Sequence, residues 1–117
     1  MICQKNDLGT ICVESAVYTT LAGFAATNCF GVKGMAVRSV TDGLVHLLRR
    51  EAMSKGVRVS FHEDDTISID LHIMVDRGVN LAAISDSIMK KVSYDVTNAT
   101  GTTVRAVNVF VDSVNPE

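Results

Sequence analysis

Two runs of alternating apolar and polar residues, separated by a short acidic segment, constrain the fold of this chain most strongly. The first run covers residues 57–61, the second covers residues 67–75, and Glu63-Asp64-Asp65 lies between them. Alternation with a period of two is typical of strands that have one buried and one more exposed face. The two runs therefore predict a β-hairpin whose turn is acidic.

The segment that follows this hairpin has helical periodicity instead. Gly78 and Asn80 precede it, and Gly101 is placed to end it. Its apolar residues recur every three or four positions, which predicts one narrow apolar stripe along a long helix. The stripe consists of Leu81, Ile84, Ile88, Val92 and Val96.

Two further helices are predicted nearer the N-terminus. Ser15 is a suitable N-cap for the first, which Gly31 ends. Asp42 can cap a second, shorter helix that stops at Gly56. The expected apolar faces are Val17, Leu21, Phe24 and Ala25 in the first helix, and Leu44, Leu47, Leu48 and Ala52 in the second.

Apolar, β-branched stretches at residues 10–14, 32–40 and 104–112 predict three more strands. The element order is then β-α-β-α-β-β-α-β. Each helix has one apolar stripe and each strong strand has one apolar face. The simplest arrangement is an α+β fold, a two-layer sandwich in which helices pack on one face of a mixed β-sheet.

Composition fits one globular domain without a strongly charged surface. A chain of 117 residues with 47% hydrophobic and 21% charged residues can form one real core. The only proline is Pro116, so no proline-rich linker divides the chain, and residues 1–117 are expected to form a single domain with its core at about 9–114. A net charge of −2 disfavours nucleic acid as a partner, because nucleic-acid binders usually carry a basic excess.

The cysteines and the hydropathy pattern bear on localisation. Cys3, Cys12 and Cys29 are odd in number and include no C-x-x-C pair, which predicts neither a disulfide framework nor a zinc site. Free thiols suit a reducing cytoplasm. The chain opens without a signal-peptide pattern and has no run of ~20 apolar residues, so a direct membrane span is not expected. Any association with a membrane would then depend on a partner.

Few residues are arranged for catalysis. His62, His72, Asp70 and Asp112 are predicted to share the sheet face that the helices leave open, where they could ligate a metal or transfer protons. Ordinary solvated polar residues are the favoured interpretation, because no third strong ligand accompanies the two histidines. G-x-S-x-G, P-loop and G-x-G-x-x-G motifs are absent from the sequence. We therefore assign no catalytic, cofactor-binding or metal-binding residue and expect no cofactor.

One short motif favours a different function. Gly31-Val32-Lys33-Gly34 is a G-x-x-G element with a lysine inside it, and KH domains clamp nucleic-acid backbones with such a loop. In a KH domain a helix follows at once, whereas residues 35–37 are expected to be extended. A KH-like RNA-binding module that uses Gly31–Gly34 is thus the alternative function.

Several segments, taken in order, resemble the alkaline shock protein family of bacterial envelope-stress proteins. They are residues 9–13, Gly31-Val32-Lys33-Gly34-Met35, residues 55–59, residues 67–75, Arg77-Gly78-Val79, Thr100-Gly101 and residues 104–111. The resemblance covers about residues 9–114. It implies a cytoplasmic, non-enzymatic protein of a Gram-positive bacterium that works in envelope stress or homeostasis. It also implies self-association and a membrane-anchored protein partner, which would hold the chain near the membrane.

The leading hypothesis is therefore function by protein–protein contact. An unprotected strand edge is a ready template for association. The valine-rich strand at residues 104–111 is the candidate contact, with Val107, Val109 and Val111 as its interaction residues and Lys33 as the residue of the RNA alternative.

Overall fold

The computed structural model describes residues 1–38 and 43–116, with the side chains of all of these except Arg50 and Glu51. Seven strands, two α-helices and a 3₁₀ helix form within them. In chain order the elements are β1 (Ile2–Asn6), β2 (Gly9–Val13), α1 (Ser15–Thr27), β3 (Val32–Arg38), β4 (Val45–Leu47), the 3₁₀ helix η1 (Arg50–Gly56), β5 (Val57–Phe61), β6 (Ile67–Asp76), α2 (Leu81–Thr100) and β7 (Val104–Asn115).

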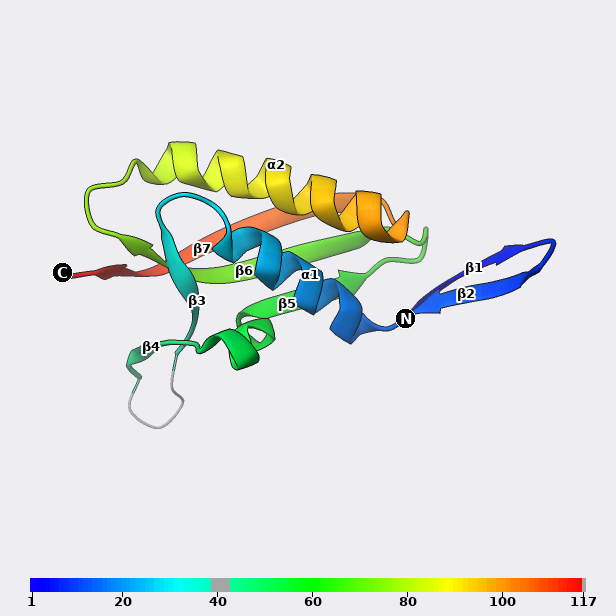
Figure 1. Ribbon diagram of the computed structural model, residues 1–117, viewed down its shortest axis with the longest axis horizontal. Coiled ribbons are helices and arrows are strands. Elements are labelled where there is room, and N and C mark those ends of the chain that lie inside the picture. The colour runs from blue at the N-terminus through cyan, green and yellow to red at the C-terminus, as the bar shows by residue number, and fades with distance from the viewer. Residues whose placement is uncertain (39–42, 117) are drawn as a thin grey trace.

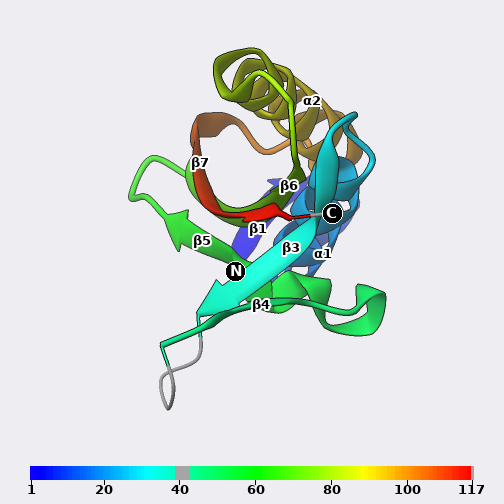
Figure 2. The ribbon, with the colours of Figure 1, turned by 90° about the vertical axis from the view of Figure 1, so that its left-hand side faces the viewer.

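Strand β6 is the centre of the main sheet. Its first half pairs with β5 and its second half with β3, both antiparallel, while β7 runs parallel to it along its whole length on the other side. Strand β4 extends the sheet beyond β3. Helices α1 and α2 lie on one face of this mixed sheet, as Figures 1 and 2 show. The predicted α+β architecture, with helices on one face and a β5–β6 hairpin, is confirmed.

The core lies between the sheet and the two helices. Every second residue of β6 is fully buried, and the α2 stripe packs onto this row as the 3.6-residue period predicts. Leu81, the first residue of the predicted stripe, is instead 45% exposed. The fully buried residues are Ile67, Ile69, Leu71, Ile73 and Val75 of β6 and Ile88, Val92 and Val96 of α2.

Glycine is required where α1 turns into β3. Gly31 has φ +86°, a conformation that side chains rarely adopt, and a Cβ there would collide with Ile84 of α2. Gly31 also accepts a backbone hydrogen bond from Asp76 at 2.8 Å, which ties the turn to the end of β6. The close approach of α1, α2 and β6 at this corner thus requires a residue without a side chain at position 31.

The predicted second helix is not formed where its apolar stripe was placed. Residues 45–47 pair with β3 as strand β4, with Leu47 opposite Ala36, and only residues 50–56 are helical, as a 3₁₀ turn. Leu47 is 42% exposed, whereas Leu48 packs against the core. Strand pairing has outweighed a weak helical period. The proposed cap, Asp42, lies outside the described residues.

The predicted apolar face of helix α1 is confirmed in part, because Ala25 is buried and Leu21 packs against the core, but its other two residues are exposed. Val17 and Phe24 are 44% and 45% exposed, while Tyr18 and Ala22 are completely buried. The buried side of the helix is rich in alanine and glycine, so α1 approaches the sheet and η1 closely. The apolar period of the sequence predicted that larger side chains would be buried, whereas the close packing of this helix favours smaller ones.

The N-terminal segment forms a β1–β2 hairpin that extends from one end of the molecule (Figure 1). Strand β1 was not predicted, and the disulfide that it makes possible was not predicted either. The hairpin register places Cys3 directly opposite Cys12, with their Cα atoms 4.0 Å apart, and the two form a disulfide. The prediction of three free thiols is therefore wrong. Only Cys29 is free among the described cysteines, and burial raises the pKa of its thiol.

A buried hydrogen bond joins the start of α1 to the segment before β7. The Tyr18 hydroxyl and the Thr102 hydroxyl lie 2.7 Å apart, at 0% and 3% exposure. The Tyr18 ring also meets Phe61 edge-on, with ring centroids 5.8 Å apart. This contact links the first and last thirds of the chain.

Replacing Tyr18 with Phe should lower the free energy of unfolding by about 1–3 kcal/mol, because it leaves the buried Thr102 hydroxyl without a partner. Urea unfolding followed by circular dichroism measures this loss. Adding Thr102→Val to the Tyr18→Phe variant should recover part of it. If the double variant loses the sum of both single losses, the two hydroxyls do not interact energetically.

Candidate interaction site

Strand β7 is the longest strand and lies at the edge of the main sheet. It pairs with β6 alone, so its outer edge has no strand partner within the described part of the chain. The backbone N–H and C=O groups on such an edge can accept another extended segment. Twelve residues give that segment a long template.

The register fixes where the three valines of the predicted interaction strand lie. Val107, Val109 and Val111 stand opposite Ile69, Leu71 and Ile73. Their side chains therefore point to the helix-covered face: Val107 is 8% exposed, and Val109 and Val111 pack against the core. What β7 offers a partner is thus its backbone edge, and not a surface made of these side chains.

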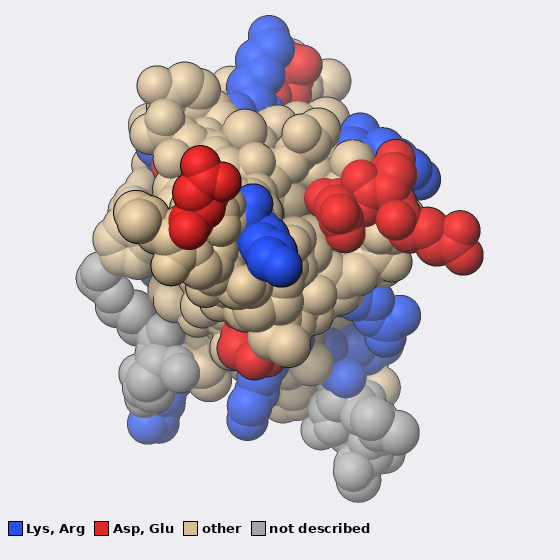
Figure 3. Space-filling model, turned by 90° about the vertical axis from the view of Figure 1, so that its right-hand side faces the viewer, with Lys and Arg blue, Asp and Glu red and all other residues tan. Residues whose placement is uncertain are grey.

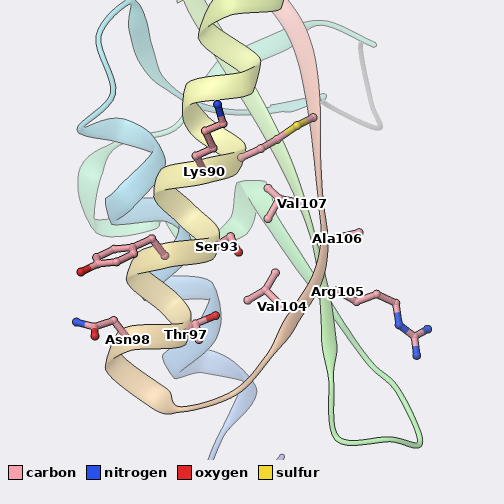
Figure 4. A pocket seen from close by; sticks show the side chains of 10 residues that line it. Lys90, Ser93, Thr97, Asn98, Val104, Arg105, Ala106 and Val107 are labelled. Atoms are coloured by element: carbon pink, nitrogen blue, oxygen red, sulfur yellow. The ribbon is translucent and has the colours of Figure 1, made fainter.

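A groove of about 630 Å³ runs between α2 and β7, next to this edge. Figure 4 shows Ser93 and Thr97 pointing from the helix, and Val104 and Val107 pointing from the strand, into the space between them. The wall is apolar with small hydroxyls, a composition that suits a chain segment with alternating side chains. The complete lining is Met89, Lys90, Ser93, Tyr94, Thr97, Asn98, Val104, Arg105, Ala106 and Val107.

Both cations beside the groove are held by carboxylates. Lys90 pairs with Asp86 one turn earlier at 2.9 Å, and the hydrogen bond from Lys90 to Asp86 raises the pKa of Lys90. Arg105 points away from the groove in Figure 4 and pairs with Asp64 at 3.0 Å. The groove between them is left essentially uncharged, so it does not select a strongly charged ligand.

The partner of Arg105 sits in the acidic turn that the sequence predicts. The Thr66 hydroxyl donates to Asp64 at 2.6 Å, and this bond, followed by that from Arg105, lowers the pKa of Asp64 to about 2. Asp64 therefore keeps its charge well into acid. It anchors the bulge of β7 at Arg105, where the β6–β7 register shifts.

Replacing Thr66 with Val should raise the pKa of Asp64 toward its ordinary value, because the leading hydrogen bond is lost. The pKa of Asp64 is lower folded than unfolded, so its contribution to stability is present above about pH 4 and is lost as pH falls toward about 2. Carboxyl-carbon NMR titration measures this pKa. An Asp64 that titrates identically in both proteins would contradict the assignment, and Arg105→Ala should shift it less than Thr66→Val.

The open sheet face carries the polar residues that the alternation predicts. His72 Nδ1 lies 3.0 Å from Asp112 Oδ2, and the imidazole stacks on Phe110 at 4.8 Å between centroids. Asn108 donates to Asp70 at 2.9 Å. A His–Asp pair can orient an imidazole for proton transfer, but no nucleophile accompanies it here among the described residues.

The two histidines do not come together. His62 bonds to Ser68 at 2.7 Å, and Ser68 lies four residues along β6 from His72, roughly 13 Å away. Within residues 1–38 and 43–116, no group of three or more His, Cys, Asp or Glu side chains is placed to hold a metal ion. The metal-dependent alternative therefore gains no support from the geometry.

The G-x-x-G element enters strand β3 and is not followed by a helix. Val32, Lys33 and Gly34 belong to that strand, and Gly34 pairs with Met74 of β6. Lys33 is exposed. Figure 3 looks onto the other end of the molecule, which carries the β1–β2 hairpin, and shows small patches of both charges there. The KH geometry is thus not reproduced.

The described residues thus form an α+β domain that leaves one sheet face uncovered by helices and the outer edge of β7 unpaired. Residues 3–116 match the model of the alkaline shock protein family, described as having a cell envelope-related function. The chain belongs to this family, which confirms the resemblance seen in the sequence.

The chain is 36% identical over 111 residues to YloU of Bacillus subtilis, covering 94% of this chain and 92% of YloU. It is 36% identical over 107 residues to Spy1614 of Streptococcus pyogenes, covering 91% of this chain and 88% of that protein.

Solved structures share the fold at low sequence identity. MamM-CTD 215-293 superposes with a TM-score of 0.51 at 16% identity, covering 86% of this chain and 99% of that chain. The copper form of MamM CTD gives 0.51 at 15% identity, with 87% and 88% covered. None of the helices in the described part of the chain is long and apolar enough to cross a membrane.

Proposed function

We propose that this protein acts without catalysis in cell-envelope stress or homeostasis, by binding other proteins through the outer edge of β7. Membership of the alkaline shock protein family supports the envelope context. The observation that carries the contact is the juxtaposition of a twelve-residue open strand edge with an apolar groove of about 630 Å³.

The fitting ligand is an extended chain segment that adds to the sheet as a further strand. Its backbone pairs with the β7 edge, and its alternate side chains enter the groove against Ser93 and Thr97. The uncharged wall favours small or medium apolar side chains there. Affinity then comes mainly from main-chain hydrogen bonds, and specificity comes from the groove.

Two sources of such a segment fit the proposal. One is a second copy of this chain, whose own β7 edge can pair with the first and give a closed, two-fold symmetric dimer. The other is a membrane-anchored protein, which would hold a cytoplasmic chain at the membrane periphery. Both use the same edge, so one set of variants addresses both.

A photo-crosslinking amino acid at position 94 tests the site. Tyr94 lines the groove and is 69% exposed, so a benzophenone there should crosslink a groove-bound partner in living cells. The expected products are the protein itself in two copies or one envelope protein. Combining this probe with Ser93→Arg, which fills the groove with a long charged side chain, should reduce the products at least tenfold.

Ser87→Arg is the matched control. Ser87 is exposed on the same helix but does not line the groove, so the identical substitution there should leave the crosslinks intact. Crosslinks that persist in the Ser93→Arg protein, or that vanish equally in the Ser87→Arg protein, would contradict the groove as the contact site.

A further inference from the structure

The open face of the sheet is hollowed beside His72, on the opposite side of the sheet from α2. The hollow has a volume of about 750 Å³, within the usual range for small-molecule sites. Residues of β3, β5, β6 and β7 and the end of η1 line it. It shares strand β7 with the α2–β7 groove through Phe110 and Asp112, but it lies on the other face of the sheet.

The strand register explains why the hollow exists. Continuing the β5–β6 register one residue beyond its last pair places Gly56 beside His72. Continuing the β3–β6 register one residue beyond Met35 places Ala36 there as well. Packing keeps Gly56 small, because a Cβ would lie 3.0 Å from the Met35 Cβ and 3.1 Å from the Ala36 carbonyl oxygen. No large side chain of these two strands therefore stands beside the imidazole, and Gly56 and Ala36, the latter 0% exposed, are themselves buried.

The imidazole of His72 is already part of an aromatic stack. It lies 4.8 Å from the Phe110 ring with 13° between the planes, and its Nδ1 is fixed 3.0 Å from Asp112. That spacing equals the distance between neighbouring strands, so the stack runs across the sheet. The side chain of His72 is 42% exposed and lines the hollow, so a third planar ring there can stack on the accessible face of the imidazole.

Cationic side chains line the same hollow. Lys55 and Arg58 are exposed, and neither has an ion-pair partner within the described residues. Arg38 lines it too, and its guanidinium donates to the Gly43 carbonyl oxygen at 2.7 Å. Three cations from separate elements, β3, η1 and β5, therefore line one hollow.

Two carboxylates also line the hollow, and both are engaged. Asp112 is held by His72, and Asp70 accepts a hydrogen bond from Asn108 at 2.9 Å. Asp70 stands opposite Arg58 in the register without an ion pair between them. Three cations against two carboxylates leave an excess of positive charge, which favours an anionic ligand.

We propose that this hollow binds a small planar aromatic molecule that carries an anionic group, such as a phosphate on a heteroaromatic nucleoside. The ring stacks on the exposed face of His72, and the anion meets Lys55 and Arg58. Stacking and charge act together, so neither half of such a molecule binds well alone. A free small molecule is favoured over a nucleic-acid strand, because the chain has a net charge of −2 and two carboxylates lie beside the cations.

Titrating the ¹⁵N-labelled full chain with AMP tests the site by NMR. AMP should shift the amide resonances of Ala36, Gly56 and His72 in a saturable manner. Adenosine and inorganic phosphate should bind at least tenfold more weakly. The variants Lys55→Ala and Arg58→Ala should each weaken AMP binding about tenfold, while Lys90→Ala and Arg105→Ala, with the same charge change elsewhere, should not.

Several results would overturn the proposal. One is no saturable shift with AMP, or shifts confined to another surface. Equal binding of phosphate or of adenosine would reduce the hollow to a plain anion site or a plain stacking site. A short single-stranded RNA that binds more than tenfold tighter than AMP, with a strong salt dependence, would assign the hollow to a nucleic-acid strand instead.

Discussion

The structure depends on the burial of one row of side chains on strand β6. Five alternate residues of this strand, from Ile67 to Val75, are 0% exposed beneath the helices. Three strands pair with β6, two on one side and one on the other. A shift of one residue in any of these registers would turn the apolar side chains of the shifted strand to the other face, so the buried row on β6 sets the geometry of the whole sheet.

The two candidate sites follow from that arrangement. Because α1 and α2 cover one face, the polar members of β6 emerge on the other, where His72 stacks on Phe110. Because β3 and β5 share one side of β6, they meet opposite His72, where Ala36 and Gly56 leave no large side chain beside the imidazole. Because β7 alone occupies the other side, its outer edge is available to a partner. Binding surfaces therefore arise on the parts of the sheet that the helices do not cover.

The sequence predicts the fold well where one period is strong and fails where two tendencies compete. The alternation of β6 and the stripe from Ile84 to Val96 are confirmed, because burial on a single face leaves a clear period. The stretch around Leu47 carries a weak helical period, and pairing with β3 decides its structure. In α1 the close approach of the helix selects small residues such as Ala22, which a search for large apolar residues overlooks.

The candidate sites were less accessible to sequence reasoning because they depend on contacts between distant segments. The hairpin that pairs Cys3 with Cys12 begins with a short strand of mixed polarity, so the cysteine count alone gave the wrong thiol state. The valine-rich strand was correctly picked out as β7, but the parallel register that buries Val107 could not be read from one segment. The groove beside it appears only when Ser93 and Val104 are brought together.

The central claim is that a partner adds to the outer edge of β7, and hydrogen–deuterium exchange measures this most directly. Amide exchange would be followed along the chain in the free protein and in the complex that it forms in cells. The account predicts slower exchange in β7 and along the groove side of α2, with β5 unchanged. Slowing confined to other elements, with the β7 amides exchanging as in the free protein, would contradict it.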